Sequence, residues 1–323
     1  FSFSWYCTSG RNSLTGVDTF KIGTAEIIFL TENTIFLLLQ RFNVKFELVC
    51  YLLEKTNLAQ YKVFMVEFEF IKMNGLGNDF VVIDQRNFAF NFTDDQIRLI
   101  CHRENGIGCD QLILIRESKI KSNPLIIFYN SNGGEINACG NGARCVANFL
   151  MKDSERKSID LITRERTIKC QKIDDEVVSI NMGHPKFKWM DIPLTKDVNL
   201  VDIKFSLGNL VLGKPFLVNI GNPHIIFFDD EIEKYDIESF GPIIENNHLF
   251  PEKINVSFAK LASKNNILLN VWERGAGRTK ACGTAACAST IAGVELGMLE
   301  NKVTVTLPGG DLEIYYAKGS YVM

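Results

Sequence analysis

The stretch ACGNGARC, residues 138–145, places a cysteine and then a glycine at the point where a helix is expected to begin. A second stretch, ACGTAACA at residues 281–288, repeats that arrangement 143 residues later. The residues after each cysteine, GARCVANFLM and TAACASTIAGVEL, are rich in alanine and other helix-favouring side chains. The sequence therefore predicts two helices at matching positions, each beginning just after a cysteine.

The repeat extends beyond the cysteines. GLGNDFVVID at residues 75–84 resembles NIGNPHIIFFD at residues 219–229, because both place Gly-Asn shortly before an apolar run. Four polar positions recur at offsets of 143 or 144 residues: Asn78 with Asn222, Gln111 with Asn255, Asn130 with Glu273, and Cys139 with Cys282. This predicts an α+β fold of two similar, pseudo-symmetric domains, each a mainly antiparallel sheet around a buried helix, with the active site in the cleft between them.

Strands dominate the predicted secondary structure. Apolar or alternating runs predict strands at residues 66–73, 80–84, 111–115, 125–129, 177–182, 216–220, 224–228, 255–262, 266–273, 303–307 and 311–316. A further helix is expected after Thr93, because Gln96 completes a capping box with it.

Residues 1–64 differ in character from the rest of the chain. Their apolar run at residues 27–42 is interrupted by polar residues and is too short to span a membrane. Neither a secretory signal nor a transit peptide is evident in them. Met65 opens a strand-like run, so we interpret residues 1–64 as an extension outside the fold. The first domain is then expected at residues 65–184 and the second at residues 185–323.

Composition limits the classes of partner. The formal net charge of −3 gives no electrostatic reason to expect nucleic acid or a membrane surface. Nine cysteines in 323 residues are too sparse for a disulfide scaffold and fit the reducing cytoplasm. We expect a small-molecule substrate. The sequence is compatible with a homodimer but does not require one.

A cysteine at a helix start has a particular chemistry. Unpaired backbone N–H groups and the helix dipole both favour the thiolate, so the pKa of Cys139 and of Cys282 is expected to fall. Gly140 and Gly283 allow a ligand to approach the backbone closely, where the same N–H groups can bind a carboxylate. A thiolate and a thiol on opposite faces of one carbon can remove and return a proton, which inverts a stereocentre without cofactor or metal.

Other interpretations of the cysteines are weaker. Buried cysteine usually acts as a small hydrophobic residue, and we interpret Cys101, Cys109, Cys145, Cys170 and Cys287 in that way. Zinc binding by the pairs 139/145 and 282/287 is disfavoured, because spacings of six and five place the two side chains on different helix faces. The second half carries His224 where the first has Phe80, and Glu273 where the first has Asn130. This asymmetry could give the two cysteines opposite protonation states, with a satisfied surface pair as the alternative.

Several segments together resemble the diaminopimelate epimerases, cofactor-independent enzymes of bacterial lysine and peptidoglycan precursor synthesis. The matching segments are KMNGLGNDFVVID, GIGCDQ, NSNGGE, ACGNGARC, GNPH, INVSF, ERGAGRTKACGT and LPGG. The resemblance implies two similar α/β domains with the active site between them. It also implies an isomerase that converts LL-2,6-diaminopimelate to the meso form by a two-base mechanism.

The resemblance carries roles to particular residues. Cys139 and Cys282 match the acid/base pair, and His224 and Glu273 match residues that tune the pKa of those cysteines. Arg274 matches a position placed to pair with a carboxylate. The remaining positions match substrate-binding residues of the family: Asn78, Gln111, Asn130, Gly140, Asn141, Asn222, Asn255, Glu273, Gly283 and Thr284.

The chain departs from the family pattern in three places. Ala285 stands where glycine is usual, and Arg278 stands where glutamate is common, close to Cys282. The chain ends at Met323, before the strand that returns to the first domain, so an unpaired sheet edge is expected there. Two alternatives stay open: an epimerase or racemase of another amino acid, and an inactive remnant, which the chain end and Ala285 suggest.

Overall fold

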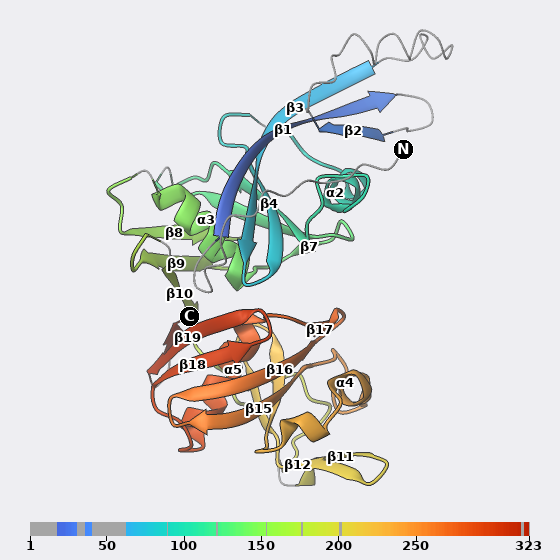
Figure 1. The fold of residues 1–323 in the computed structure, drawn as a ribbon, viewed down its shortest axis with the longest axis vertical. Helices are drawn as coiled ribbons and strands as arrows, with labels where there is room; N and C mark the ends of the chain where they lie inside the picture. The colour runs from blue at the N-terminus through green and yellow to red at the C-terminus, as the bar shows by residue number, and fades with distance from the viewer. Residues whose placement is uncertain are drawn as a thin grey trace.

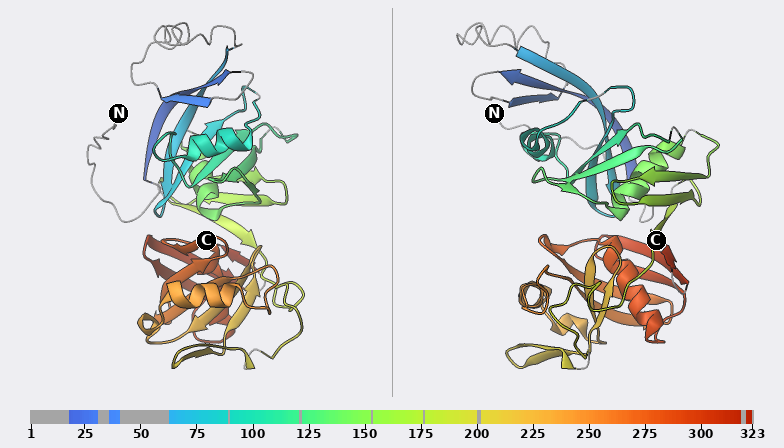
Figure 2. Two further views of the ribbon diagram at one scale, coloured as in Figure 1. Left: turned by 90° about the vertical axis from the view of Figure 1, so that its right-hand side faces the viewer. Right: turned by 180° about the vertical axis from the view of Figure 1, so that it is seen from behind.

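The computed structural model describes residues 18–30, 36–40, 63–88, 90–120, 122–152, 154–175, 177–199, 202–317 and 320–322. Within these ranges the chain forms two halves that lie one above the other along the long axis of the molecule (Figure 1). Two further views show the end of the first half and the end of the chain meeting at the junction (Figure 2).

The first half is a sheet with two helices. Its elements, in chain order, are β3 (Val63–Gly75), β4 (Asn78–Asp84), α2 (Asp94–Cys101), β5 (Gln111–Arg116), β6 (Leu125–Asn130), β7 (Glu135–Ile136), α3 (Gly140–Met151), β8 (Ser158–Ile162), β9 (Thr167–Lys172) and β10 (Val178–Gly183). β4 pairs antiparallel with β3 and parallel with β5, and β5 pairs antiparallel with β6. After α3, β8 runs parallel to β6 and continues through antiparallel pairs into β9 and β10.

The second half begins with a separate hairpin and then repeats this plan. Its elements are β11 (Lys204–Leu207), β12 (Leu210–Gly213), β13 (Phe216–Asn219), β14 (Pro223–Phe228), the 3-10 helix η2 (Ile232–Lys234), α4 (Ile237–Glu245), β15 (Asn255–Ser263), β16 (Asn266–Glu273), β17 (Gly277–Thr279), α5 (Gly283–Glu295), β18 (Lys302–Leu307) and β19 (Gly310–Ala317). β14 pairs antiparallel with β13 and parallel with β15, as β4 does with β3 and β5. After α5, β18 runs parallel to β16 and antiparallel to β19. The predicted α+β fold of two similar domains is confirmed.

The repeat holds in the strand register as well as in the order of elements. Phe80 on β4 lies opposite Gln111 on β5, and their counterparts His224 and Asn255 lie opposite each other on β14 and β15. Gln111 lies in turn opposite Asn130 on β6. The recurring polar positions therefore occupy the same places in both sheets.

Local sequence accounts for the ends of the helices. The Thr93 hydroxyl accepts from the Gln96 backbone N–H, and Gln96 Oε1 accepts from the Thr93 N–H at 2.8 Å, so the predicted capping box is present. α4 was not predicted, because Gly241 and Pro242 lie inside it. Asp236 caps its start, and its place between two parallel strands matches that of α2.

The two helices that follow the cysteines lie inside the structure. Phe80 and Val82 on β4 belong to a core cluster that also contains buried side chains of α3 and α5. The alternate residues Val81 and Ile83 belong to a second cluster, on the α2 side of the same strand. α4 has a corresponding cluster of its own in the second half. Each sheet is thus buried on both faces. One face packs against α3 or α5, and the other packs against α2 or α4.

Two segments of the N-terminal region belong to the first sheet. β1 (Asp18–Leu30) pairs antiparallel with β3 over its whole length, and β2 (Phe36–Gln40) pairs antiparallel with β1. The interpretation of residues 1–64 as lying outside the fold is therefore wrong for these two strands. Sequence patterning missed them because they have no clean strand alternation.

The chain end also differs from expectation. Residues Ser320–Val322 form the short strand β20, which pairs with β19 on one side and with β10 of the first half on the other. The expected unpaired edge on β10 is therefore covered at Asn181 and Gly183.

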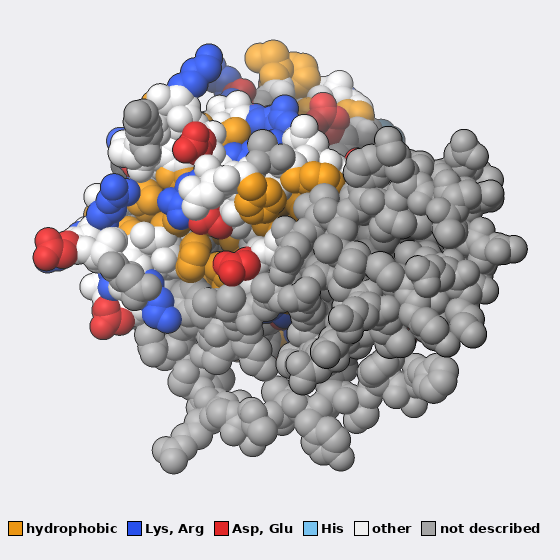
Figure 3. All heavy atoms as spheres, turned by 90° about the horizontal axis from the view of Figure 1, so that it is seen from above, with side chains coloured by type: hydrophobic (Ala, Val, Ile, Leu, Met, Phe, Trp, Pro, Cys, Tyr) orange, Lys and Arg blue, Asp and Glu red, His pale blue; other side chains and the backbone are white. Residues whose placement is uncertain are grey.

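The surface of the first half agrees with the near-neutral charge of the chain. Seen from above, the described side chains mix basic, acidic and hydrophobic groups without one sign of charge dominating that face (Figure 3). None of the helices in the described ranges is long and apolar enough to cross a membrane.

Close packing of α3 against its sheet gives a test of the core. A Cβ added at Gly142 would lie 2.8 Å from Ile113 Cδ1 and 3.2 Å from Phe128 Cε1. We expect Gly142→Ala to lower the free energy of unfolding by about 1–3 kcal/mol, despite the better helix propensity of alanine. Chemical denaturation would measure the change.

Gly213→Ala is the matched control, because its added Cβ would meet Lys204 Cγ at an ordinary 3.6 Å. An equal effect of the two substitutions would contradict the proposed packing of α3.

Candidate active site

A cavity of about 870 Å³ is lined by residues of both halves. It contains most of the residues singled out in the sequence: Asn78, Gln111, Asn130, Cys139, Gly140, Asn141, Asn222, Glu273, Arg274, Cys282, Gly283 and Thr284. His224 and Asn255 do not line it. The repeat therefore brings residues that are distant in the chain to one cavity.

Each of the two cysteines stands immediately before a buried helix. Cys139 is the N-cap of α3, and its Sγ accepts from the Gly142 N–H at 3.5 Å. Cys282 is the N-cap of α5, and its Sγ lies 3.4 Å from Thr284 Oγ1. Both thiols are free, Cys139 partly buried and Cys282 buried.

Burial opposes the effect of the helix starts. It raises the pKa of Cys139 to about 11, and the N–H groups of Gly142 and Asn141 offset only part of that rise. Burial also raises the pKa of Cys282 well above its usual value. The expectation that the pKa of both thiols falls is therefore wrong, because desolvation of a buried thiolate outweighs the helix N–H groups.

Glu273 creates an asymmetry between the two thiols. Burial raises the pKa of its carboxyl, while the Thr279 hydroxyl and the Cys282 thiol beside it act in the opposite direction. Its negative charge raises the pKa of both thiols, and its contact with Cys282 raises the pKa of that thiol further. The carboxylate therefore disfavours a thiolate at Cys282 more directly than at Cys139.

His224 lies behind the cavity wall. Its Nε2 is 2.9 Å from Asn222 Oδ1, and because an amide oxygen can only accept, Nε2 carries the proton. Burial, and then the charge of Arg274, lower the pKa of His224 to about 3. The expected second titratable group is thus a neutral imidazole throughout the neutral pH range.

A chain of contacts leads from this imidazole to Cys282. Asn222 accepts from His224 and donates from Nδ2 to Thr284 Oγ1 at 3.4 Å. The Thr284 hydroxyl is then free to donate its own proton toward the Cys282 sulfur, which partly lowers the pKa of that thiol. His224 thus acts on Cys282 through hydrogen-bond polarity rather than through charge.

Asn255 does not line the cavity but contacts the backbone of Arg274, which does. Its Nδ2 donates to the Pro223 carbonyl, and its Oδ1 accepts from the Arg274 backbone N–H, both at 2.9 Å. The side chain is buried with its amide engaged by the backbone, which differs from the predicted role at the substrate. It fixes the peptide that carries Arg274, whose guanidinium donates to the Glu252 carbonyl.

The matching position of the first half keeps polar atoms at the cavity. Gln111 Nε2 donates to Asn130 Oδ1 at 3.1 Å. Gln111 Oε1 is shielded from solvent and has no hydrogen-bond partner within the described ranges. An acceptor of this kind, at a cavity wall, is suited to a ligand N–H.

An ion-pair network that includes two residues lining the cavity, Arg103 and Asp110, was not predicted from the sequence. Arg103 donates to Asp79 Oδ2 at 2.9 Å and to Asp110 Oδ1 at 2.6 Å. Asp110 Oδ2 accepts from Asn78 Nδ2 and from the Asp79 N–H. The network fixes the Asn78 side chain at the cavity. Asp110 stands beside Gln111 in the motif GCDQ, which was the available indication.

Two positions of the second half, Arg278 and Ala285, depart from the family pattern, and the structure shows their contacts. Arg278 reaches Glu238 on α4 at 3.3 Å, does not line the cavity, and so does not bring its charge to Cys282 as expected. Ala285 is buried, and its N–H contributes to the environment of the Cys282 thiol. Thr279 and Lys280, which sequence reasoning passed over, do line the cavity.

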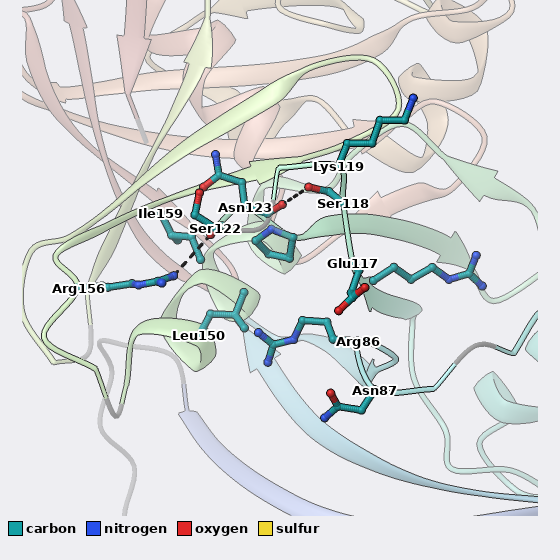
Figure 4. A pocket seen from close by; sticks show the side chains of 12 residues that line it. Arg86, Asn87, Glu117, Ser118, Lys119, Ser122, Asn123, Leu150, Arg156 and Ile159 are labelled. Atoms are coloured by element: carbon teal, nitrogen blue, oxygen red, sulfur yellow. Dashed lines mark hydrogen bonds between the residues drawn. The ribbon is translucent and has the colours of Figure 1, made fainter.

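A second cavity of about 690 Å³ lies on the first half, beside the end of α3 (Figure 4). Its arginines are held by the protein itself, since Arg86 pairs with Asp84 and Arg156 reaches the Ser122 carbonyl. None of the predicted site residues lines it. In the described ranges, no three His, Cys, Asp or Glu side chains are grouped as metal ligands.

Comparison with known families gives a match over most of the chain. The family model described as diaminopimelate epimerase matches residues 70–188 and 216–320. A diaminopimelate epimerase of Pelagibacter ubique is 47% identical over 247 residues, covering 75% of this chain and 89% of that protein. One of Methylocella silvestris is 40% identical, covering 76% of this chain and 86% of that protein.

Solved structures share the fold at low sequence identity. A phenazine biosynthesis protein of the PhzF family from Bacillus anthracis has a TM-score of 0.55 and 12% identity, covering 94% of each chain. A hydroxyproline epimerase from Agrobacterium vitis, solved with trans-4-hydroxy-L-proline, has a TM-score of 0.52 and 12% identity, covering 78% of this chain and 86% of that one.

The different burial of the thiols predicts selective alkylation. Among the described cysteines only Cys139 is not fully buried, so iodoacetamide is expected to modify it first. Because its pKa is about 11, the labelling rate should rise about tenfold per pH unit between pH 7 and pH 9. Peptide mass spectrometry would follow each site. Earlier labelling of Cys282 or Cys287 would contradict this order.

The Arg103 network predicts a pH-dependent contribution to stability. Despite burial, which acts to raise it, the pKa of Asp79 is lowered by Arg103 and Asn74. Its contribution is therefore present above the unfolded pKa and lost as pH falls through the lowered folded pKa. We expect Arg103→Met to lower the free energy of unfolding by about 1 kcal/mol or less at pH 7, and by much less at pH 2.

Urea denaturation at both pH values would measure that difference. Lys302→Met, which removes an exposed pair with Glu313, is the control and should change little at either pH. A loss at Arg103 that is equal at pH 7 and pH 2 would rule out the carboxylate linkage.

Proposed function

The chain belongs to the diaminopimelate epimerase family, and we propose on that premise that it interconverts LL- and meso-2,6-diaminopimelate. The family makes the chain an isomerase. One observation carries the proposal most: two free thiols, each at the start of a buried helix from a different half, line one cavity.

The reaction requires a base and an acid on opposite sides of the α-carbon. One thiolate removes the α-proton, and the thiol of the other cysteine delivers a proton to the opposite face. The carbon is inverted, and the thiolate and thiol have exchanged places. Protons balance within the pair, so the proposed cycle consumes no oxidant, reductant or cofactor.

The N-termini of α3 and α5 are expected to stabilise the intermediate that forms when the α-proton is removed. Removal of the α-proton places negative charge on the carboxylate that neighbours the reacting carbon. We expect the backbone N–H groups at the starts of α3 and α5 to bind that carboxylate, because Gly140, Asn141, Gly283 and Thr284 line the cavity. Buried N–H groups whose positions are already fixed stabilise developing charge without reorganisation.

The remaining lining residues suit a substrate with an amino acid group at each end. Asn78, Asn130 and Asn222 offer amides, and Gln111 Oε1 offers an unused acceptor for an ammonium group. Arg274 supplies a guanidinium for a second carboxylate. Asn255 contributes by holding the Arg274 backbone. We place the reaction in the cytoplasm, where reducing conditions keep both thiols free.

Isotope exchange tests the proposed reaction. The full chain is incubated with LL-2,6-diaminopimelate in deuterated water, and α-deuterium and the meso isomer are followed by NMR and chiral chromatography. Cys139→Ala and Cys282→Ala are each expected to reduce turnover by about 10²–10⁴-fold or more, because each removes one acid/base group.

Cys170→Ala is the matched control, because Cys170 is a buried thiol on β9 that does not line the cavity. Full activity in either cavity variant would exclude the two-base mechanism. Absence of exchange in the folded wild type would exclude diaminopimelate as the substrate. The remaining alternatives would be an epimerase of another amino acid and an inactive protein.

A further inference from the structure

Asp110 lines the cavity, and both oxygens of its carboxylate accept hydrogen bonds. Its Oδ1 accepts from Arg103 Nη2 at 2.6 Å. Its Oδ2 accepts from Asn78 Nδ2 at 3.0 Å and from the Asp79 N–H at 2.8 Å. Three donors from two separate segments of the first half therefore converge on one side chain.

The carboxylate determines which way the Asn78 amide is turned. A carboxylate can only accept hydrogen bonds, so the amide nitrogen must be the atom that faces Asp110. The amide oxygen, Oδ1, is left without a partner among the hydrogen bonds of the described residues. Because Asn78 lines the cavity, this oxygen is an acceptor available to a ligand.

The turn that carries Asn78 is fixed by other contacts as well. Gly77 has a left-handed backbone conformation, with φ of 82°. Asn74 closes the turn, because its Oδ1 accepts from the Gly77 N–H and its Nδ2 donates to Asp79 Oδ1. The backbone position of Asn78 therefore does not depend on Asp110 alone. What the carboxylate adds is the orientation of the Asn78 side chain.

The equivalent asparagine of the second half is oriented by different partners. Asn222 Oδ1 accepts from His224, and Asn222 Nδ2 donates to Thr284 Oγ1. Its oxygen is thus engaged, and the second hydrogen of its nitrogen remains for a ligand. Asn222 also lines the cavity. The two repeated asparagines therefore present opposite groups to one cavity, an oxygen from the first half and an N–H from the second.

The repeat identifies the side chains that cause this difference. At the offset of 144 residues that relates the two asparagines, Ile254 stands in the place of Asp110. The buried Ile254 side chain can accept no hydrogen bond, so it cannot orient an amide. In the second half His224 has that role, and its counterpart in the first half is Phe80. The carboxylate is therefore specific to the first half and not a requirement of the shared fold.

We propose that Asp110 is a positioning residue that holds the Asn78 amide with its oxygen toward the ligand, where it accepts from a substrate ammonium group. The identity of that ammonium group rests on the proposed function, whereas the orientation of the amide does not. Gln111 Oε1, the acceptor without a partner at the cavity wall, belongs to the next residue of the chain. The first half thus offers two acceptors that suit an ammonium group and repel a carboxylate.

Three variants separate the orientation of Asn78 from the ion pairs of the network. Asp110→Asn cannot accept from both Arg103 and Asn78, because one of its two oxygens becomes a nitrogen. Asp79→Asn is the matched control, since it weakens an ion pair with the same arginine but leaves the bond between Asn78 and Asp110. The double exchange, Asn78→Asp with Asp110→Asn, restores a donor and an acceptor across this contact.

Steady-state kinetics of the full chain with LL-2,6-diaminopimelate give the first readout. We expect Asp110→Asn to raise KM about tenfold while kcat stays within about threefold, because the lost ammonium bond is present in both the ground state and the transition state. Asp79→Asn should keep KM within about twofold of wild type. The double exchange should return KM to within about threefold, because a carboxylate at position 78 presents an acceptor in either orientation.

A second readout needs no substrate. In the wild type one Nδ2 proton of Asn78 is bonded to a carboxylate, so its NMR signal should lie downfield of unbonded side-chain amides. The signal is identified in isotope-labelled protein by its absence from Asn78→Asp. We expect Asp110→Asn to lose the downfield shift and Asp79→Asn to keep it.

Three outcomes overturn the proposal. The first is a wild-type KM and amide signal in Asp110→Asn, and the second is an equal rise of KM in Asp79→Asn, which would indicate a structural role only. The third is a double exchange that folds and leaves KM raised. Should Asp110→Asn not fold, Asn78→Asp is compared with the double exchange, because only the single variant brings two carboxylates together. If the wild type does not turn over diaminopimelate, the proposed function fails, while the amide signal still decides the orientation of Asn78.

Discussion

The competition between burial and backbone N–H groups at two helix starts is the constraint on which this structure depends. A thiol placed there meets donors that favour its anion, yet the same protein interior removes the water that would stabilise it. For Cys139 and Cys282 burial prevails in the structure, and the pKa of both thiols is raised. Only neighbouring charges and hydrogen bonds are left to decide which thiol gives up its proton.

The duplicated scaffold makes that decision possible. Matching strands and helices bring two equivalent thiols to one cavity, and equivalence alone would give them equal pKa values. The halves differ at a few corresponding positions: Phe80 against His224, Asn130 against Glu273, and Arg144 against Cys287. His224 reaches the Cys282 sulfur through Asn222 and Thr284, and Glu273 acts on that sulfur directly. Asymmetry is thus introduced by single side chains while the backbone plan is kept.

Features that depend on a pattern of residues along the chain could be predicted from the sequence. The repeat predicted the two-domain fold, and the box formed by Thr93 and Gln96 predicted the start of α2. The depth at which a side chain is buried does not follow from a local sequence pattern. The predicted direction of the pKa shifts of Cys139 and Cys282 was therefore wrong. α4 was missed because Pro242 masks its local preference, and Arg103 was missed because its partners are set by a turn and a parallel strand pair.

The two thiols are controlled by different physical means. At Cys139 the sulfur accepts directly from a backbone N–H, that of Gly142. Behind Cys282 lies a neutral chain, in which His224 orients Asn222, and Asn222 orients Thr284. Such a chain can only offer a donor to the sulfur, and Glu273 opposes it directly. The two thiols are therefore unequal, because Glu273 disfavours the anion more directly at Cys282 than at Cys139.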